Sequence, residues 1–222
     1  MDFGFSEEQR DVQNLARQIL SEQVTPESLA RFDEYQEYGF DRELWAKLAE
    51  AGLLGIAIED AFGGMGFGFT ELALFIEEVG RNIAPVPAIP ALVSAALPLQ
   101  RFGSTEQRER WLPGIVSGEH ILSAGLMEPL NEDPANPLVT KATRDGDGWR
   151  LAGTKNCVPL AEQAERVLLS ARSEDGVIVV MLDPRAPGVS LIPLRVTNYE
   201  AQYQVVLDDV VIAAEDVLVL ED

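Results

Sequence analysis

Residues 62–68 read Phe-Gly-Gly-Met-Gly-Phe-Gly, a glycine density that could let the backbone close around a phosphate. A Walker-type phosphate loop also needs a terminal Gly-Lys-Ser/Thr to reach the phosphates and magnesium, and this stretch has none. A dinucleotide fingerprint needs G-x-G-x-x-G between a strand and a helix, whereas the glycines here are Gly64, Gly66 and Gly68 in helical surroundings. We interpret the stretch as a close-packed loop between helices, with nucleotide-phosphate binding as the alternative.

The single cysteine and the single histidine are the other candidates for chemistry. Cys157 could act as a nucleophile only with a base beside it, and His120 is the one imidazole available. We interpret Cys157 as a small buried hydrophobic residue and His120 as a structural or surface residue. One cysteine excludes an intramolecular disulfide and a cysteine metal cage, and one histidine leaves little for a zinc site or a Ser-His-Asp triad.

Three acidic pairs could provide acid–base chemistry, namely Glu77-Glu78, Asp208-Asp209 and Glu215-Asp216. Such pairs most often lie on solvated faces or in turns, so we assign them no acid–base role. The whole chain is acidic, with 37 Asp and Glu against 17 Lys and Arg and a net charge of −20. This charge argues against binding to nucleic acid and to anionic membranes, because both would repel the chain.

The composition is that of a globular protein, since 46% of the residues are hydrophobic. The amino-terminal sequence has no cationic region followed by an apolar core, so no secretory signal is predicted. No apolar run is long enough to span a bilayer, and a cytoplasmic location is the default expectation.

The elements that would position these residues are helices in the first half of the chain. Ser6 and Gln9 form a predicted capping box, and Pro26 ends or redirects the helix that follows. Asp41 is expected to cap a second helix that stops at Gly52. The remaining helices are predicted from a Thr70 cap to a stop at Gly80, over 91–100, and from Ser104 to 116.

Beyond Gly118 the pattern changes to short strands. Residues 138–144 and 149–153 flank Asp145-Gly146-Asp147-Gly148 and predict a hairpin. Further strands are expected at 166–172, 177–183, 188–196, 202–207 and 210–213. The fold class is therefore α+β: a helical amino-terminal domain over 1–119, then an antiparallel β-barrel or sandwich over 120–222. This segregation argues against a βαβ Rossmann unit.

An ordered set of motifs resembles the acyl-CoA dehydrogenase family over nearly the whole chain. The helical part carries Leu53-Leu54-Gly55-Ile56, Phe62-Gly63-Gly64-Met65-Gly66, Glu77-Glu78-Val79-Gly80-Arg81, Phe102-Gly103-Ser104-Thr105-Glu106-Gln107 and Trp111-Leu112-Pro113. The β part carries Glu128-Pro129, Gly153-Thr154-Lys155, Leu207-Asp208-Asp209-Val210 and Glu215-Asp216-Val217-Leu218. Each motif is weak alone, and their order and spacing carry the resemblance.

The resemblance implies a third, carboxy-terminal four-helix domain that would begin where this chain stops, at Asp222. In the family that domain usually carries the catalytic Glu and part of the FAD diphosphate site. We therefore expect it to be absent here, no catalytic residue to lie within 1–222, and these residues to be inactive alone. Residues 53–58 and 89–99 are the expected exposed faces that would meet the missing bundle, so self-association or partner binding is predicted.

The resemblance also implies chemistry and a flavin site. A carboxylate removes the α-proton of an acyl-CoA thioester while a hydride passes from the β-carbon to FAD, and an electron acceptor reoxidises the flavin. Two stretches would hold the flavin ring; here they place Leu126, Met127 and Pro129 in the first, and Cys157, Val158 and Pro159 in the second.

Both stretches depart from the family pattern. Met127 stands where Thr is common, and Asn131-Glu132-Asp133-Pro134 stands where Gly-Ser-Asp is expected. Cys157 replaces a Trp, and Pro159 replaces the hydroxyl residue near flavin N5. Because proline has neither a hydroxyl nor an N–H, it can donate no hydrogen bond there.

These departures resemble one subunit type of the heteromeric acyl-CoA dehydrogenases of actinobacterial steroid side-chain breakdown, in which flavin sites are fewer than subunits. We expect a partner subunit of such a hetero-oligomer, with FAD bound only together with its partner. The alternatives are a non-enzymatic binding or scaffold protein that keeps the fold, and an independently active homo-oligomeric dehydrogenase.

Overall fold

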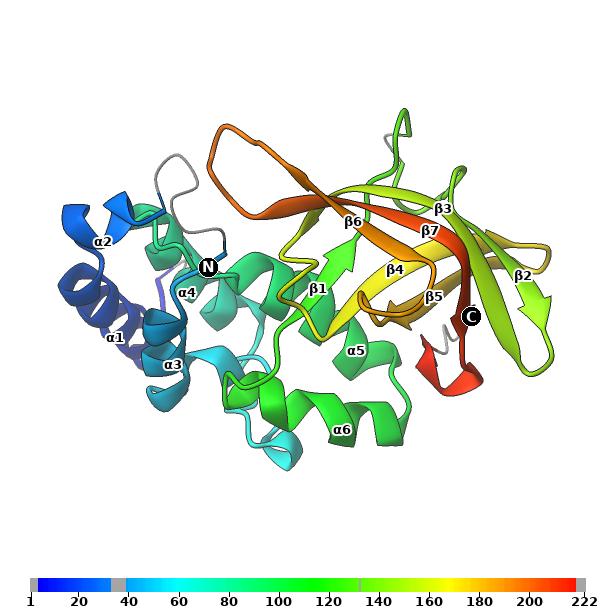
Figure 1. The fold of residues 1–222 in the computed structure, drawn as a ribbon. Helices are drawn as coiled ribbons and strands as arrows, with labels where there is room; N and C mark the ends of the chain where they lie inside the picture. Colours follow the sequence, from blue (N-terminus) through cyan, green and yellow to red (C-terminus); the bar gives the residue numbers. More distant parts are fainter. Residues whose placement is uncertain (1–3, 33–38, 132, 219–222) are drawn as a thin grey trace.

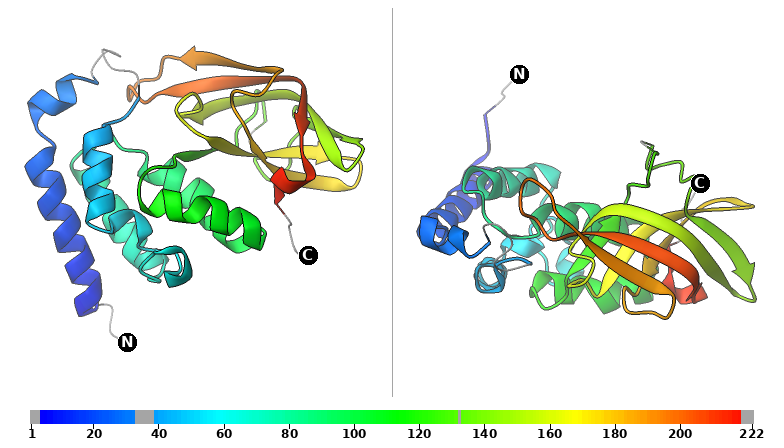
Figure 2. Two further views of the ribbon diagram at one scale, coloured as in Figure 1. Left: turned by 60° about the horizontal axis from the view of Figure 1, so that its bottom comes forward. Right: turned by 45° about the horizontal axis from the view of Figure 1, so that its top comes forward.

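The computed structural model describes residues 4–32, 39–131 and 133–218. A helical half and a β half lie side by side, with the strands packed along one flank of the helices (Figure 1). Rotated views show the same division, with the first helix, Glu7–Gln23, on the side of the helical half away from the sheet (Figure 2). Within the described residues, no helix combines the length and apolarity that a membrane crossing requires.

The first helices begin where short-range capping predicts. α1 spans Glu7–Gln23. At its start, the Ser6 hydroxyl accepts from the Gln9 N–H, and the Gln9 side-chain oxygen accepts from the Ser6 N–H. α2 (Pro26–Ala30) begins with Pro26 in its first turn, so this proline does redirect the chain. α3 (Arg42–Glu50) is capped by Asp41 and followed by Gly52 at φ 78°. Two 3₁₀ turns follow, Leu53–Gly55 and Asp60–Phe62.

The later helices depart in part from the predicted ends. α4 (Phe69–Arg81) starts after Gly68, not at Thr70, because the Glu71 carboxylate accepts from the Gly68 N–H at 2.9 Å. It also continues through Gly80. The predicted helix over 91–100 is a π-helix, Ala88–Ala96, that runs directly into α5 (Leu97–Phe102), with Pro98 in the first turn of α5. α6 (Thr105–Val116) is capped by Ser104 as predicted.

The β half is one eight-stranded sheet. Its strands are β1 Leu122–Gly125, β2 Lys141–Asp145, β3 Gly148–Pro159, β4 Arg166–Ser173, β5 Gly176–Leu182, β6 Val189–Leu194, β7 Gln202–Ile212 and β8 Val217–Leu218. The spatial order is β6-β7-β3-β2-β4-β5-β8, with β1 beside β4. Most pairs are antiparallel, as predicted, including the β2–β3 hairpin, while β1 and β2 meet β4 in parallel.

Two predicted strands, 202–207 and 210–213, form the single strand β7. Asp209 has φ 54° within it, so the acidic pair makes a local irregularity and not a turn. The helical half ends at Val116 and the first strand begins at Leu122. One continuous hydrophobic core runs through both halves.

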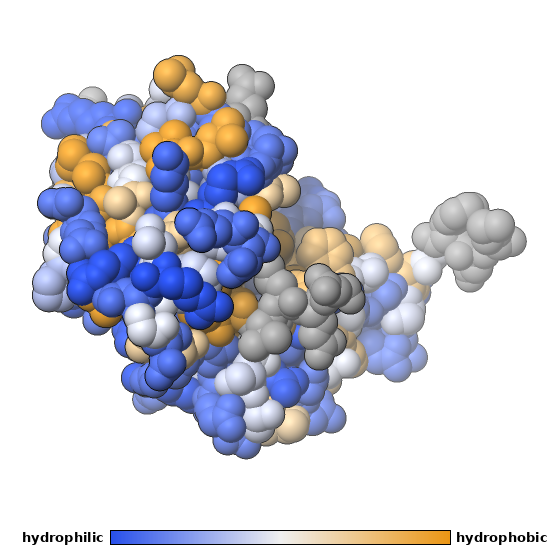
Figure 3. Space-filling model, turned by 90° about the vertical axis from the view of Figure 1, so that its right-hand side faces the viewer, coloured by the Kyte–Doolittle hydropathy of each residue, from blue (hydrophilic) through white to orange (hydrophobic). Residues whose placement is uncertain are grey.

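The expectation that residues 53–58 and 89–99 present exposed apolar faces is wrong. Leu53, Leu54, Ile56 and Ile58 are buried in the core, and of the second stretch Ile89 alone is an exposed large hydrophobic residue. The 3₁₀ turn, the residues that follow it and the π-helix all contribute apolar side chains to the core. On the face seen in Figure 3, hydrophilic side chains predominate, with separate hydrophobic groups between them.

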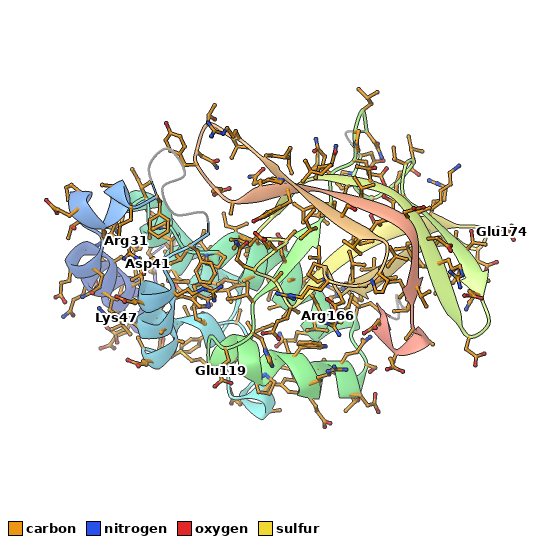
Figure 4. All side chains as sticks on the ribbon, viewed as in Figure 1. Arg31, Asp41, Lys47, Glu119, Arg166 and Glu174 are labelled. Carbon is orange, nitrogen blue, oxygen red and sulfur yellow. The ribbon has the colours of Figure 1, made fainter. Side chains whose placement is uncertain are left out.

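Arg166 lies where α6 meets the sheet (Figure 4). Its guanidinium carbon is 5.0 Å from the centre of the Trp111 ring, and Asp183 is 3.7 Å from its Nη1. The Gln107 amide, on α6, donates to the carbonyls of Glu215 and Val217 at 2.7 and 3.1 Å. The Gln107 contacts hold residues 215–217 against the helical half, and the Arg166–Trp111 contact joins β4 to α6.

Candidate functional site

The two stretches that sequence resemblance assigns to a flavin ring lie side by side. The first follows β1 and contains Leu126, Met127 and Pro129; the second ends β3 and contains Cys157, Val158 and Pro159. The Asn156 N–H donates to the Met127 carbonyl at 2.8 Å, which joins the stretches directly. Leu126, Met127 and Cys157 are exposed, the two prolines are half-buried, and Val158 is buried. Their role toward a flavin stays a prediction.

Cys157 is exposed, so the interpretation as a buried hydrophobic residue is wrong. The pairing of β3 with β7 shifts register between Lys155 and Val158, and Cys157 has φ 51°. A bulge of this kind adds one residue to a strand and changes which face the next side chains take. Alternation along the sequence could not place the bulge, because it depends on the partner strand.

His120 is engaged at the junction of the two halves, as the structural interpretation predicted. Its Nδ1 is 2.6 Å from a Glu165 carboxylate oxygen, and its ring meets the Trp111 ring edge-on at 5.3 Å. Gly114 leaves room for it, since a Cβ there would lie 1.9 Å from the imidazole. Groups of three or more His, Cys, Asp or Glu able to hold a metal ion are absent from the described residues.

Pro159 has no N–H, and its carbonyl accepts from the Ser123 hydroxyl. It faces Gln202 across the β3–β7 ladder. A flavin ring nitrogen needs a hydrogen-bond donor, and Pro159 offers neither a backbone nor a side-chain one. At this position the chain therefore does not fit the FAD contact that the family resemblance implies.

A buried ion pair lies directly behind both stretches. The Lys155 ammonium is 2.9 Å from a Glu128 carboxylate oxygen, and the side chains are 0% and 1% exposed. The same carboxylate accepts from the backbone N–H groups of Leu138, Val139 and Thr140 at 2.7, 2.8 and 2.9 Å. Asn131 donates to it at 3.1 Å, and Ser170 is 3.4 Å from the ammonium.

These contacts set the ionisation of the pair. Burial acts to raise the pKa of Glu128, but the backbone donors of Val139 and Thr140 and the ammonium of Lys155 outweigh it and hold this pKa well below its usual range. Burial lowers the pKa of Lys155 in spite of the favourable contact with Glu128. Glu128 is therefore a carboxylate at every pH near neutrality.

We expect acid to destabilise the chain partly through Glu128. Below about pH 4.3, the ordinary glutamate pKa, the unfolded chain takes up a proton that folded Glu128 refuses, so stability falls by up to about 1.4 kcal/mol per pH unit from this group. Above that pH its contribution is constant. Glu128→Gln should remove this component of the slope when urea unfolding is followed from pH 6 to 3. Equal slopes in both proteins would contradict the assignment.

The glycine-rich stretch is a packed loop, and the phosphate alternative is not supported. Its N–H groups are already bonded: those of Met65, Gly66 and Phe67 donate to the carbonyls of Gly55, Ile58 and Ile56 at 2.8, 2.8 and 2.9 Å. A phosphate cradle needs free N–H groups that converge on one point. Here they hold the loop against the turn that precedes it.

Two acidic residues differ from the solvated-face interpretation. Glu78 is fully buried, and the Arg17 guanidinium, 2.7 Å away, holds its pKa below the usual range together with Arg81. Asp216 is half-buried, and burial raises its pKa against the attraction of Arg166 and Arg110. Glu78 joins α1 to α4, while Asp216 lies at the junction of the two halves.

Glu128 and Lys155 belong to the motifs of the family resemblance, but no role was predicted for them. A signal was present: Trp149 and Leu151 face inward on β3, and alternation puts Lys155 on the same face. Because a lysine is almost never fully buried without a partner, an inward lysine predicts a buried carboxylate. The sequence alone did not say which of the 37 acids supplies it.

Comparison with known proteins gives a consistent family. The family described as "Acyl-CoA dehydrogenase, N-terminal domain" matches residues 6–119. Acyl-CoA dehydrogenase FadE27 of Mycobacterium tuberculosis is 35% identical over 198 residues, which cover 89% of this chain and 52% of that protein. The chain thus spans about half the length of the curated relatives it matches.

Solved structures agree with the sequence relatives. The Tcur3481-Tcur3483 steroid ACAD is 40% identical, with a TM-score of 0.87 over 96% of this chain and 57% of that one. The ChsE4-ChsE5 complex from Mycobacterium tuberculosis is 32% identical, with a TM-score of 0.91 over 98% and 58%. The motifs, the helical half followed by a mostly antiparallel sheet, and these matches establish that the chain belongs to the acyl-CoA dehydrogenase family.

Proposed function

We propose that this chain is a partner subunit of a heteromeric acyl-CoA dehydrogenase. The complex would carry out α,β-dehydrogenation of an acyl-CoA thioester with FAD as hydride acceptor, and steroid side-chain CoA esters are the proposed substrates. Two similar structures support this: one is described as a steroid ACAD, and both carry paired subunit names. An electron-transfer protein is the proposed acceptor that reoxidises the flavin, as the family resemblance implies.

The main support for the partner role comes from the composition of the second stretch. Pro159 offers no donor toward a flavin nitrogen, and the exposed Cys157 presents a small thiol where the family pattern has an aromatic ring. Losing a hydrogen bond to a polar ring atom costs about 1–3 kcal/mol. We therefore infer that the flavin is held chiefly by the other subunit, and that this chain contributes to the shape of the site and to the interface.

The test is the flavin count of the complex co-purified from its native host. We expect fewer than one FAD per subunit of the complex. Pro159→Thr should raise flavin affinity about tenfold, because it adds a hydroxyl and an N–H, and Cys157→Trp should raise it further by adding an aromatic face. Flavin absorbance per subunit and titration with FAD would measure both.

Pro193→Thr is the matched control, since it makes the same change at an exposed proline of β6, outside the two stretches. It should leave flavin content unchanged. One tightly bound FAD per copy, lost when this chain's second stretch is altered, would favour an independently active homo-oligomer. Turnover of octanoyl-CoA or a steroid-CoA by residues 1–222 alone would also contradict the partner role.

A further inference from the structure

We propose that Glu128 and Lys155 are a positioning pair that fixes the spacing between the exposed residues of the two stretches, Leu126 and Met127 in the first and Cys157 in the second. Glu128 directly follows Met127, and Lys155 precedes Cys157 by two residues. The 2.9 Å contact between their charged groups therefore acts as a short tie between the backbones on which both stretches are built. The proposal concerns this spacing and holds whether or not either stretch contacts a flavin.

A third segment of the chain also donates hydrogen bonds to the Glu128 carboxylate. The N–H groups of Leu138, Val139 and Thr140 all point at Glu128, so the backbone that enters β2 is fixed by the acid that fixes the first stretch. Asn131 donates to Glu128 and also to the Asn136 carbonyl, at 3.1 and 3.0 Å. The first stretch, residues 138–140 and Lys155 thus meet at one buried side chain, although 10 to 27 residues separate them from Glu128 in the chain or they adjoin it directly.

Stabilisation of the fold alone does not explain why this buried site holds a charged pair. A buried ion pair is often no more stabilising than apolar residues of the same volume, because both charges must leave water. A charged pair with directed hydrogen bonds does differ from an apolar contact in one respect, since it permits a single relative placement of the groups that it joins. In this chain, the single placement fixes the position at which the two surface stretches meet.

Two residues with a strained backbone lie close to the pair in the chain. Leu130 and Cys157 have φ 59° and 51°, in the left-handed region that side chains other than glycine rarely adopt. Such residues persist only where the surroundings determine their conformation. One strained residue follows Glu128 by two positions and the other follows Lys155 by two, so the pair anchors both strained turns.

The test uses the Asn156 amide, whose hydrogen bond to Met127 joins the two stretches but involves neither charged residue. Hydrogen exchange of this amide would be followed by NMR in the full chain and in Lys155→Met. We expect Asn156 to exchange about tenfold faster in the variant, relative to the slowest-exchanging amides of the chain, which report global unfolding. A nitroxide on Cys157, the native single cysteine, should become more mobile in the same variant.

Glu78→Gln is the matched control, because Glu78 is a second fully buried, ion-paired acid and lies in the helical half. It should change global stability while leaving the relative exchange of Asn156 within about twofold. If Lys155→Met does not fold, Glu128→Asp retains the charge, shortens the side chain by one methylene and takes the same measurements. Unchanged relative exchange of Asn156, or equal acceleration by Glu78→Gln, would overturn the proposal. Flavin content enters neither readout, so the proposed function can fail independently.

Discussion

Glu128→Gln should lower the free energy of unfolding by about 3–5 kcal/mol, a large part of the total for a single-domain protein. The substitution leaves the Lys155 ammonium buried without a carboxylate beside it, with the Ser170 hydroxyl 3.4 Å away. It also replaces a carboxylate that accepts three backbone N–H groups by an amide with one acceptor oxygen. Urea unfolding at neutral pH, followed by circular dichroism, would measure the change.

Two further variants make this result specific. Lys155→Met should be less damaging, because Glu128 keeps its backbone donors and its Asn131 amide. Glu119→Gln makes the same chemical change at an exposed acid and should alter stability by less than about 0.5 kcal/mol. A Glu128→Gln protein as stable as the Glu119→Gln protein would show that the ion pair contributes nothing to folding.

Gly64→Ala is the second substitution expected to have a large effect, about 3 kcal/mol of destabilisation. A Cβ at this position would lie 2.0 Å from the Ile58 carbonyl oxygen and 2.8 Å from that of Gly55. Both are backbone atoms that accept hydrogen bonds from the same loop, so they cannot move without breaking those bonds. The midpoint of thermal unfolding would report the loss.

The neighbouring Gly63 provides the comparison. A Cβ there meets nothing within 4 Å, and φ 85° alone makes alanine unfavourable, by about 1–2 kcal/mol. We therefore expect Gly63→Ala to be clearly milder than Gly64→Ala. Equal effects of the two substitutions would mean that the close contacts at Gly64 cost no more than the left-handed backbone at Gly63.

The sequence predicted most of what depends on residues close together in the chain. Ser6 with Gln9, Asp41 with Leu44 and Ser104 with Gln107 cap helices through bonds that span three residues. The hairpin between β2 and β3 follows from the glycine-rich turn, and Gly146 takes the left-handed conformation that such a turn needs. The predicted Thr70 cap lies two residues from the observed N-cap, Gly68, because Glu71 closes the first turn from inside the helix.

Buried and exposed positions were predicted less well in irregular segments. Leu53 and Leu54 lie in a 3₁₀ turn and residues 89–96 in a π-helix, whose periods differ from the helix or strand periods that sequence patterns reveal. Free cysteines are usually buried, which is the reason for the buried prediction at Cys157, but the β3 bulge turns this residue outward. In each case the direction of a side chain depends on a local break in regular geometry.

By itself, then, the sequence determined the helical half, the β half, their order and the family resemblance, because capping, turn formation and side-chain periodicity act over a few residues. Only the tertiary structure decided that Glu128 pairs with Lys155, 27 residues away, and that Asn156 joins the two exposed stretches. No local pattern specifies such a pair. It forms because a lysine carried inward by β3 must find one carboxylate, and the sheet brings Glu128 within 2.9 Å of it.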